Sequence, residues 1–75
     1  MKSFEIILDT VEKVKEFSEL INKFDGEFDL ISDKYIIDAK SIMSIFSLDL
    51  SNPLILQVKD VENIEELETL LKNFM

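Results

Sequence analysis

The chain has 75 residues and a formal net charge of −8, and it contains neither cysteine nor histidine. This excludes a disulfide framework, Cys/His zinc sites, thiol nucleophiles and imidazole acid–base catalysis. Sixteen acidic residues against eight lysines disfavour binding to phosphate backbones and to anionic lipid heads. We therefore expect a single domain over residues 1–75, with no nucleic-acid or membrane partner.

The N-terminus does not follow the pattern of a secretory signal, because Lys2 and Glu5 bring charge into its first residues. The longest apolar runs fall far short of the ~20 residues that cross a bilayer. Together these two features predict a cytoplasmic protein.

The first predicted strand covers residues 4–8, where alternate side chains are apolar. A helix is expected to begin at the capping box Asp9-Thr10-Val11-Glu12, with Asp9 as the capping residue. The helix should end at Asp25-Gly26, where the only glycine suits a left-handed position. Apolar residues at spacings of three and four predict a buried stripe of Val11, Val14, Phe17, Leu20, Ile21 and Phe24.

Residues 27–31 and 34–38 predict two strands joined by a tight turn at Ser32 and Asp33. Phe28 and Leu30 share one face of this hairpin. The sequence leaves the register open: either Tyr35 and Ile37, or Ile36, complete that face.

Ser41 is predicted to cap a short helix over residues 42–48. Ile45 and Leu48 share one side of this helix. Other apolar residues lie at spacings of one, three and four: Ile42, Met43 and Phe46. Two turns cannot bury both sides in so small a protein, so one set should face the core and the other solvent.

Ser51-Asn52-Pro53 interrupts the pattern, and alternation over residues 54–59 predicts a fourth strand. A second capping box, Asn63-Ile64-Glu65-Glu66, opens the last helix. The apolar residues of that helix are Ile64, Leu67, Leu70, Leu71 and Phe74. The order β-α-β-β-α-β-α indicates an α+β fold of two layers, with sheet order 4-1-3-2 (ferredoxin-like) or 1-4-2-3.

Acidic side chains at the capping boxes and on the helices invite an enzymatic or metal-binding hypothesis. They are Asp9, Glu12, Glu65, Glu66 and Glu68. Such chemistry needs carboxylates that converge in a cleft, whereas caps and solvent faces carry acidic residues in any case. We therefore predict no catalytic residue, metal or cofactor, and we assign Lys13 and Lys15 to a solvated face.

The segment Ala39-Lys40-Ser41-Ile42-Met43, followed by Ser47-Leu48, resembles the regulatory-site segment of HPr, the histidine-containing phosphocarrier of the bacterial sugar phosphotransferase system. The order of elements, the length and the acidic final helix agree with HPr over the whole chain. The resemblance implies the HPr-like open-faced β-sandwich, with sheet order 1-4-2-3.

The resemblance also implies a departure from the family at the first helix. HPr proteins carry phosphate on a histidine there, and aligning the helices on Phe17 places Thr10 at that position. Glu12 and Lys13 then match the family's arginine and proline, and Glu12 has the opposite charge to an arginine that helps to engage a transcription regulator. Since a threonine phosphoester lacks the transfer potential of phosphohistidine, we expect no phosphocarrier activity.

A retained serine without the histidine is similar to the catabolite-repression variants of HPr. That similarity implies phosphorylation of Ser41 by an HPr kinase/phosphorylase, followed by binding to a LacI-type regulator. Backbone N–H groups at the start of the short helix would stabilise the phosphate, with Lys40 alongside. The alternative for Ser41 is an ordinary helix cap without phosphorylation.

The same resemblance implies that Ile45 is buried and that an exposed apolar patch beside Lys40 binds partner proteins. The patch consists of Ile42, Met43 and Phe46. In one alternative all three side chains face the sheet. In another the patch packs against a second copy, and the chain is a structural or assembly protein, so a monomer and a weak homodimer both stay open. A third is a carrier paralogue without activity.

Overall fold

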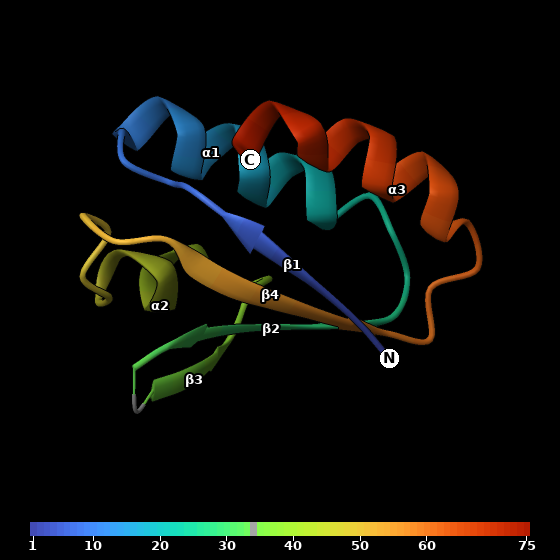
Figure 1. Cartoon of the computed structure of the whole chain (residues 1–75), viewed down its shortest axis with the longest axis horizontal. Helices are drawn as coiled ribbons and strands as arrows, with labels where there is room; N and C mark the ends of the chain where they lie inside the picture. The colour runs from blue at the N-terminus through green and yellow to red at the C-terminus, as the bar shows by residue number, and fades with distance from the viewer. Residues whose placement is uncertain (34) are drawn as a thin grey trace.

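The computed structural model describes residues 1–33 and 35–75, and it places the helices against one face of a four-stranded antiparallel sheet (Figure 1). The elements are β1 (Lys2–Ile6), α1 (Val11–Ile21), β2 (Glu27–Ser32), β3 (Tyr35–Asp38), α2 (Ile42–Phe46), β4 (Leu54–Lys59), α3 (Ile64–Leu71) and the 3₁₀ turn η1 (Lys72–Phe74). Lys34, predicted to begin the second hairpin strand, lies outside the described residues.

The strands are arranged in the order β1-β4-β2-β3, and each neighbouring pair is antiparallel. This confirms the order 1-4-2-3 and excludes the ferredoxin-like order. The sheet centre is formed by β4 and β2, whereas β1 and β3 are its edges. In Figure 1, α1 and α3 lie side by side over the sheet.

The register of the strands sorts their side chains onto two faces. Phe4 on β1 is paired with Leu56 on β4, which is paired in turn with Leu30 on β2, and all three are buried under the helices. The next partner in that row is Ile37 on β3, which is half-buried and packs on the core. The open question about the hairpin is thereby settled in favour of the face that contains Ile37.

The other residues of β3 are exposed. Ile36 points to the face opposite the helices and is 68% exposed. Tyr35 lies two residues before Ile37 and therefore belongs to the same face of the strand, but it is also 68% exposed. Of the two alternatives, Tyr35 with Ile37 or Ile36 alone, the first holds in part: β3 contributes Ile37 to the core, but not Tyr35.

A buried aromatic pair packs α1 against η1 within the helical layer. Phe17 of α1 meets Phe74 of η1 edge to face, with ring centroids 5.7 Å apart and planes at 81°. The backbone N–H of Ile7 donates to the Phe74 carbonyl at 2.6 Å, which ties the end of the chain to the segment after β1. The predicted stripe of α1 holds except at Val11, which is 53% exposed in the first helical position.

The end of α1 differs from the sequence prediction. The helix ends at Ile21, with Asn22 as its C-terminal cap, and residues 22–24 form a turn. Gly26 lies beyond this turn at φ +122°, where a Cβ atom would come within 2.8 Å of the Lys59 carbonyl oxygen. The glycine is therefore required by its close approach to the end of β4 rather than by a helix terminus.

The second capping box forms in altered detail. The Asn63 side-chain oxygen accepts from the Glu66 backbone N–H at 3.4 Å, which caps α3 as predicted. The Glu66 carboxylate, however, accepts from the Asn63 side-chain amide at 2.8 Å instead of from the backbone N–H of the cap. The helix begins at Ile64 in either arrangement.

Candidate functional site

The short helix α2 is bounded by two serines. Ser41 occupies the N-cap position with an extended backbone (φ −95°, ψ 102°), and its carbonyl accepts the first helical hydrogen bond from Ile45 at 3.1 Å. At the other end Ser47 caps the helix, and its hydroxyl donates to the Ser44 carbonyl at 2.6 Å. The regular helix therefore ends at Phe46, two residues before the predicted end, and tightens into a final turn.

The apolar residues of α2 divide between core and solvent. Ile45 is fully buried, as the resemblance implies. Met43 is 78% exposed and Phe46 is 41% exposed, and their spacing of three places them on one side of the helix. Ile42 is half-buried and packs partly on the core, so it forms the base of the patch rather than its exposed part. We call Ile42, Met43 and Phe46 the α2 surface.

The Ser41 side chain does not make the predicted capping bond to the backbone. Its hydroxyl oxygen lies 3.1 Å from that of Ser44, one turn further on, and Ser41 is half-buried. Because the hydroxyl is held by a second hydroxyl and not by a backbone N–H, the free N–H groups at the start of α2 are not used by this side chain. Any group added to the Ser41 oxygen would displace the contact with Ser44.

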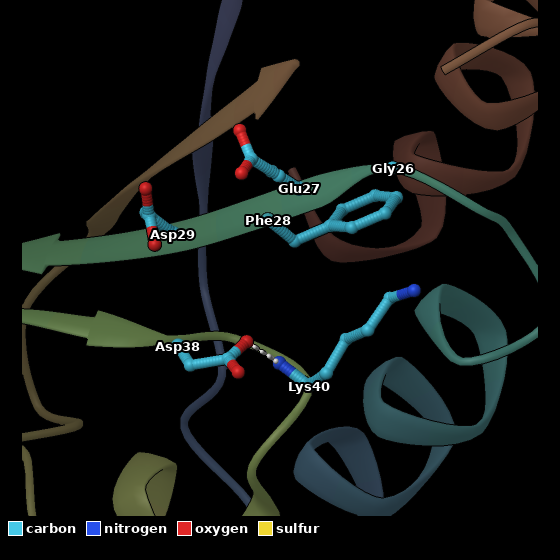
Figure 2. A pocket seen from close by; sticks show the side chains of 6 residues that line it. All are labelled: Gly26, Glu27, Phe28, Asp29, Asp38 and Lys40. Carbon is cyan, nitrogen blue, oxygen red and sulfur yellow. Dashed lines mark hydrogen bonds between the residues drawn. The ribbon is translucent and has the colours of Figure 1, made fainter. Parts of the chain in front are cut away.

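The Lys40 side chain contacts the segment between α1 and β2. Its ammonium donates to the Phe24 carbonyl at 2.7 Å and lies 5.2 Å from the centre of the Phe28 ring. Figure 2 shows the side chain running beside Phe28, on the rim of a hollow of about 300 Å³. In this structure the Lys40 ammonium is therefore engaged by the Phe24 carbonyl, and its place beside a Ser41 phosphate stays a prediction.

The segment before α2 is attached to α1. The Asn22 side-chain amide donates to the Ser18 carbonyl at 2.8 Å and reaches the Lys40 carbonyl at 3.4 Å. The Asp38 carboxylate accepts from the Lys40 backbone N–H at 2.9 Å. These bonds fix the backbone that leads into Ser41.

The loop after α2 is closed by Asp49. Its carboxylate accepts from the Ser51 hydroxyl at 2.5 Å and from the Ser51 backbone N–H at 3.1 Å. These bonds, the hydroxyl bond first, lower the pKa of Asp49 because they stabilise the charged form. The α2 surface is thus held between two hydrogen-bonded loops.

At the start of α1, Thr10 is the capping residue in place of Asp9. Its hydroxyl accepts from the Lys13 backbone N–H at 3.1 Å. Asp9 instead forms an ion pair with the Lys13 ammonium at 3.0 Å. The sequence contains two adjacent residues that can cap a helix, and because the helix begins at Val11, the second of them, Thr10, holds the N-cap position. The Thr10 hydroxyl is therefore already used by the backbone of α1.

Asp9 gives a prediction about pH. The hydrogen bond and the charge of Lys13 lower the pKa of Asp9 below its ordinary value of 3.8. The contribution of Asp9 to stability is therefore present above pH 3.8 and is lost as the pH falls through its folded pKa. Asp9→Asn should slightly lower Tm at about pH 7, and the difference should vanish at about pH 2. A difference that grows on acidification, in thermal melts followed by circular dichroism, would contradict this assignment.

The other acidic candidates lie on separate parts of the helices. Glu68 of α3 pairs with Lys2 of β1 at 2.9 Å, and Glu66 is engaged with Asn63. Over residues 1–33 and 35–75, the structure contains no group of three or more acidic side chains that could hold a metal ion. In the same residues, no helix is long and apolar enough to cross a membrane.

Comparison with known proteins supports the fold. No protein-family model matches the chain, and no curated protein sequence matches it significantly. Among solved structures, a crystal structure described as HPr-C-His from Thermoanaerobacter tengcongensis superposes with a TM-score of 0.76 at 28% sequence identity. The match covers 96% of this chain and 92% of that protein. The chain therefore has an HPr-like fold.

Two features of the site were not predicted from the sequence. One is the engagement of Lys40 with Phe24 and Phe28, which joins residues 16 and 12 positions apart in the chain. The other is the arrangement of side chains on the uncovered face of the sheet, which depends on strand register. Alternation within β2 and β4 indicates which residues share a face, but their neighbours become known only with the strand order.

Proposed function

We propose that this chain is a regulatory protein-binding module with an HPr-like fold over residues 1–75, related to the bacterial sugar phosphotransferase system. It acts in the cytoplasm, without enzymatic activity, by binding proteins through the α2 surface. The observation that carries this proposal is the exposure of Met43 and Phe46 on the helix that begins at Ser41. The chain contains no histidine to carry phosphate.

The α2 surface has the properties of a protein contact. Ile45 anchors the helix in the core, and Ile42 supports the exposed side chains from below. Exposed apolar clusters with a flexible methionine suit binding to partners of varied shape. Lys40, which precedes Ser41, lies beside this surface in the chain, and we propose that it contacts the partner as well.

Ser41 is the proposed switch. A phosphate on its oxygen would replace the contact with Ser44 and would lie at the start of α2, where backbone N–H groups are free of side-chain caps. It would also make the net charge more negative by about 2 units, next to apolar side chains that bind the partner. The kinase is of the HPr kinase/phosphorylase type, and the phosphorylated chain binds a LacI-type regulator.

Phosphate relay is not part of this function. Thr10 occupies the position that matches the family histidine, and its hydroxyl caps α1. Asp9 and Glu12 add negative charge on either side of it. A phosphate ester on Thr10 would lose the cap and meet this charge without gaining the transfer potential of a phosphoramidate.

The test of the switch is incubation with HPr kinase/phosphorylase and ATP, followed by intact-mass measurement. We expect the wild-type chain to gain one phosphate and Ser41→Ala to gain none. Ser44→Ala is the matched control, because it removes the neighbouring hydroxyl and should still be phosphorylated. No gain by the wild type, or a gain that survives Ser41→Ala, would reject Ser41 as the site.

The second candidate is a structural or assembly role in which the α2 surface packs against another copy. The high exposure of Met43 favours this assembly role, because burying an exposed apolar side chain against another copy lowers the free energy. Sedimentation at micromolar concentration separates the two functions. A monomer that stays monomeric supports the regulatory module, whereas a dimer dispersed by Phe46→Ser supports assembly.

A further inference from the structure

The face of the sheet opposite the helices carries an apolar row. Ile55 on β4 is paired with Ile31 on β2, which is paired with Ile36 on β3, so the three side chains cross three neighbouring strands. Directly opposed residues have Cβ atoms about 5 Å apart, so the row is continuous. Ile36 is 68% exposed and Ile55 is 36% exposed. We call these residues the isoleucine row.

A row of acidic side chains lies next to it. Asp29 on β2 is paired directly with Asp38 on β3, and both are exposed. Figure 2 shows these two aspartates on neighbouring strands, with Glu27 one step further along β2. Like charges placed directly opposite each other destabilise a sheet. We call Asp29 and Asp38 the aspartate pair.

The charge of the aspartate pair is not compensated within the described residues. The ion pairs found over residues 1–33 and 35–75 are Lys2 with Glu68 and Lys13 with Asp9, and neither involves this face. Lys40 lines the same hollow as the aspartate pair, but its ammonium is turned to the Phe24 carbonyl. Lys59 on β4 lies on the same face, but it is paired across the strands with Glu27, and neither aspartate has an ion pair in the described residues. The face thus joins exposed apolar surface to an aspartate pair that no described lysine ammonium neutralises.

We propose that this open face binds a basic segment of a partner protein, with a lysine or arginine on the aspartate pair and an apolar side chain on the isoleucine row. The charge of the site selects the occupant, because only a cation relieves the repulsion between Asp29 and Asp38. Neighbouring rows are about 7 Å apart along a strand, which sets the spacing of the two groups on the partner. The site is independent of the α2 surface.

A second copy of this chain does not fit the site. Each copy carries a net charge of −8, and the same face also bears Glu5 and Glu27 against a single described lysine, Lys59. Packing two such faces together would bring like charges into one interface, which costs free energy unless cations enter with them. A partner segment that carries both a basic and an apolar side chain provides a cation for the aspartate pair and an apolar contact for the isoleucine row.

The test uses the full chain labelled with nitrogen-15 and a peptide that repeats lysine, threonine, isoleucine, threonine, so that its lysine and isoleucine side chains share one face of a strand. We expect amide shifts at the isoleucine row and the aspartate pair, with an affinity that falls as salt is added. The double variant Asp29→Asn/Asp38→Asn should bind about tenfold more weakly, yet melt at a higher temperature, because the like-charge pair is gone. Ile36→Ser should also weaken binding.

Glu16→Gln/Glu19→Gln is the matched control, since it removes the same charge from exposed positions on α1. It should bind the peptide as the wild type does. Equal weakening by this control would show that only the overall charge attracts the peptide, and it would overturn the proposal. Shifts confined to α2, an absence of shifts, or dimerisation through the open face would overturn it as well.

Discussion

Replacing Phe17 with alanine should lower the free energy of unfolding by about 3–5 kcal/mol. The side chain is fully buried and makes the edge-to-face contact with Phe74 that holds η1 on the helical layer. A chain of this size has only about 4–11 kcal/mol of stability in total, so the loss is a large fraction of it. Urea denaturation of wild type and variant at 25 °C measures the effect.

Phe46→Ala is the matched control for that change. It removes the same atoms from α2, but Phe46 is 41% exposed, so we expect a loss of less than about 1 kcal/mol. Comparing the loss in free energy of unfolding between the two variants shows how much Phe46 contributes to stability relative to the buried Phe17. If Phe46→Ala destabilised the chain as much as Phe17→Ala does, Phe46 would be a core residue and the α2 surface would lose its main exposed member.

Gly26→Ala should cost about 3 kcal/mol or more. At φ +122° an L-residue is strained, and the new Cβ would lie 2.8 Å from the Lys59 carbonyl oxygen and 2.9 Å from that of Asp60. Both atoms are backbone, so relief requires a shift of the chain at the end of β4. The loss should appear as a lower midpoint in urea denaturation.

Asp25→Ala is the control in the same loop, since Asp25 is exposed and precedes the glycine. It should change stability by less than about 0.5 kcal/mol. A Gly26→Ala variant as stable as the wild type would mean that the backbone at the end of β4 can shift to make room for the Cβ atom at little cost in free energy. The close approach would then not explain the chain's only glycine.

The long helices were predictable because their apolar spacing is local and regular. The stripe of α1 and the Asn63 cap of α3 follow from residues within a few turns of each other. The start and end of α1 were less accurate. Asp9 and Thr10 are adjacent residues that both cap helices well, and only the helix phase selects Thr10. Gly26 resembles a helix terminus, but its cause is a contact with the end of β4.

The candidate site was predictable in part. The excess of apolar residues on α2 indicated that some must be exposed, and Met43 and Phe46 are. The sequence could not assign Ile42, because its partial burial depends on how α2 rests on the core. Nor could it place Lys40, whose partners Phe24 and Phe28 precede it by more than ten residues. Strand order came from the resemblance to HPr and not from element order.

The two proposed binding surfaces differ in chemistry. The α2 surface is apolar and begins at a serine, whereas the open face of the sheet joins an isoleucine row to an aspartate pair. A partner that binds one face leaves the other free. Under the two proposals above, the chain joins two proteins, and Ser41 controls one of the two contacts.

The most direct test of the account is a titration of the nitrogen-15-labelled chain with an HPr kinase/phosphorylase, followed by amide shifts. We predict that Met43, Phe46 and their neighbours on α2 shift, that the isoleucine row does not, and that Phe46→Ser weakens binding about tenfold or more. Shifts that leave α2 unchanged, or an affinity that Phe46→Ser does not alter, would contradict the claim that α2 is where partners bind.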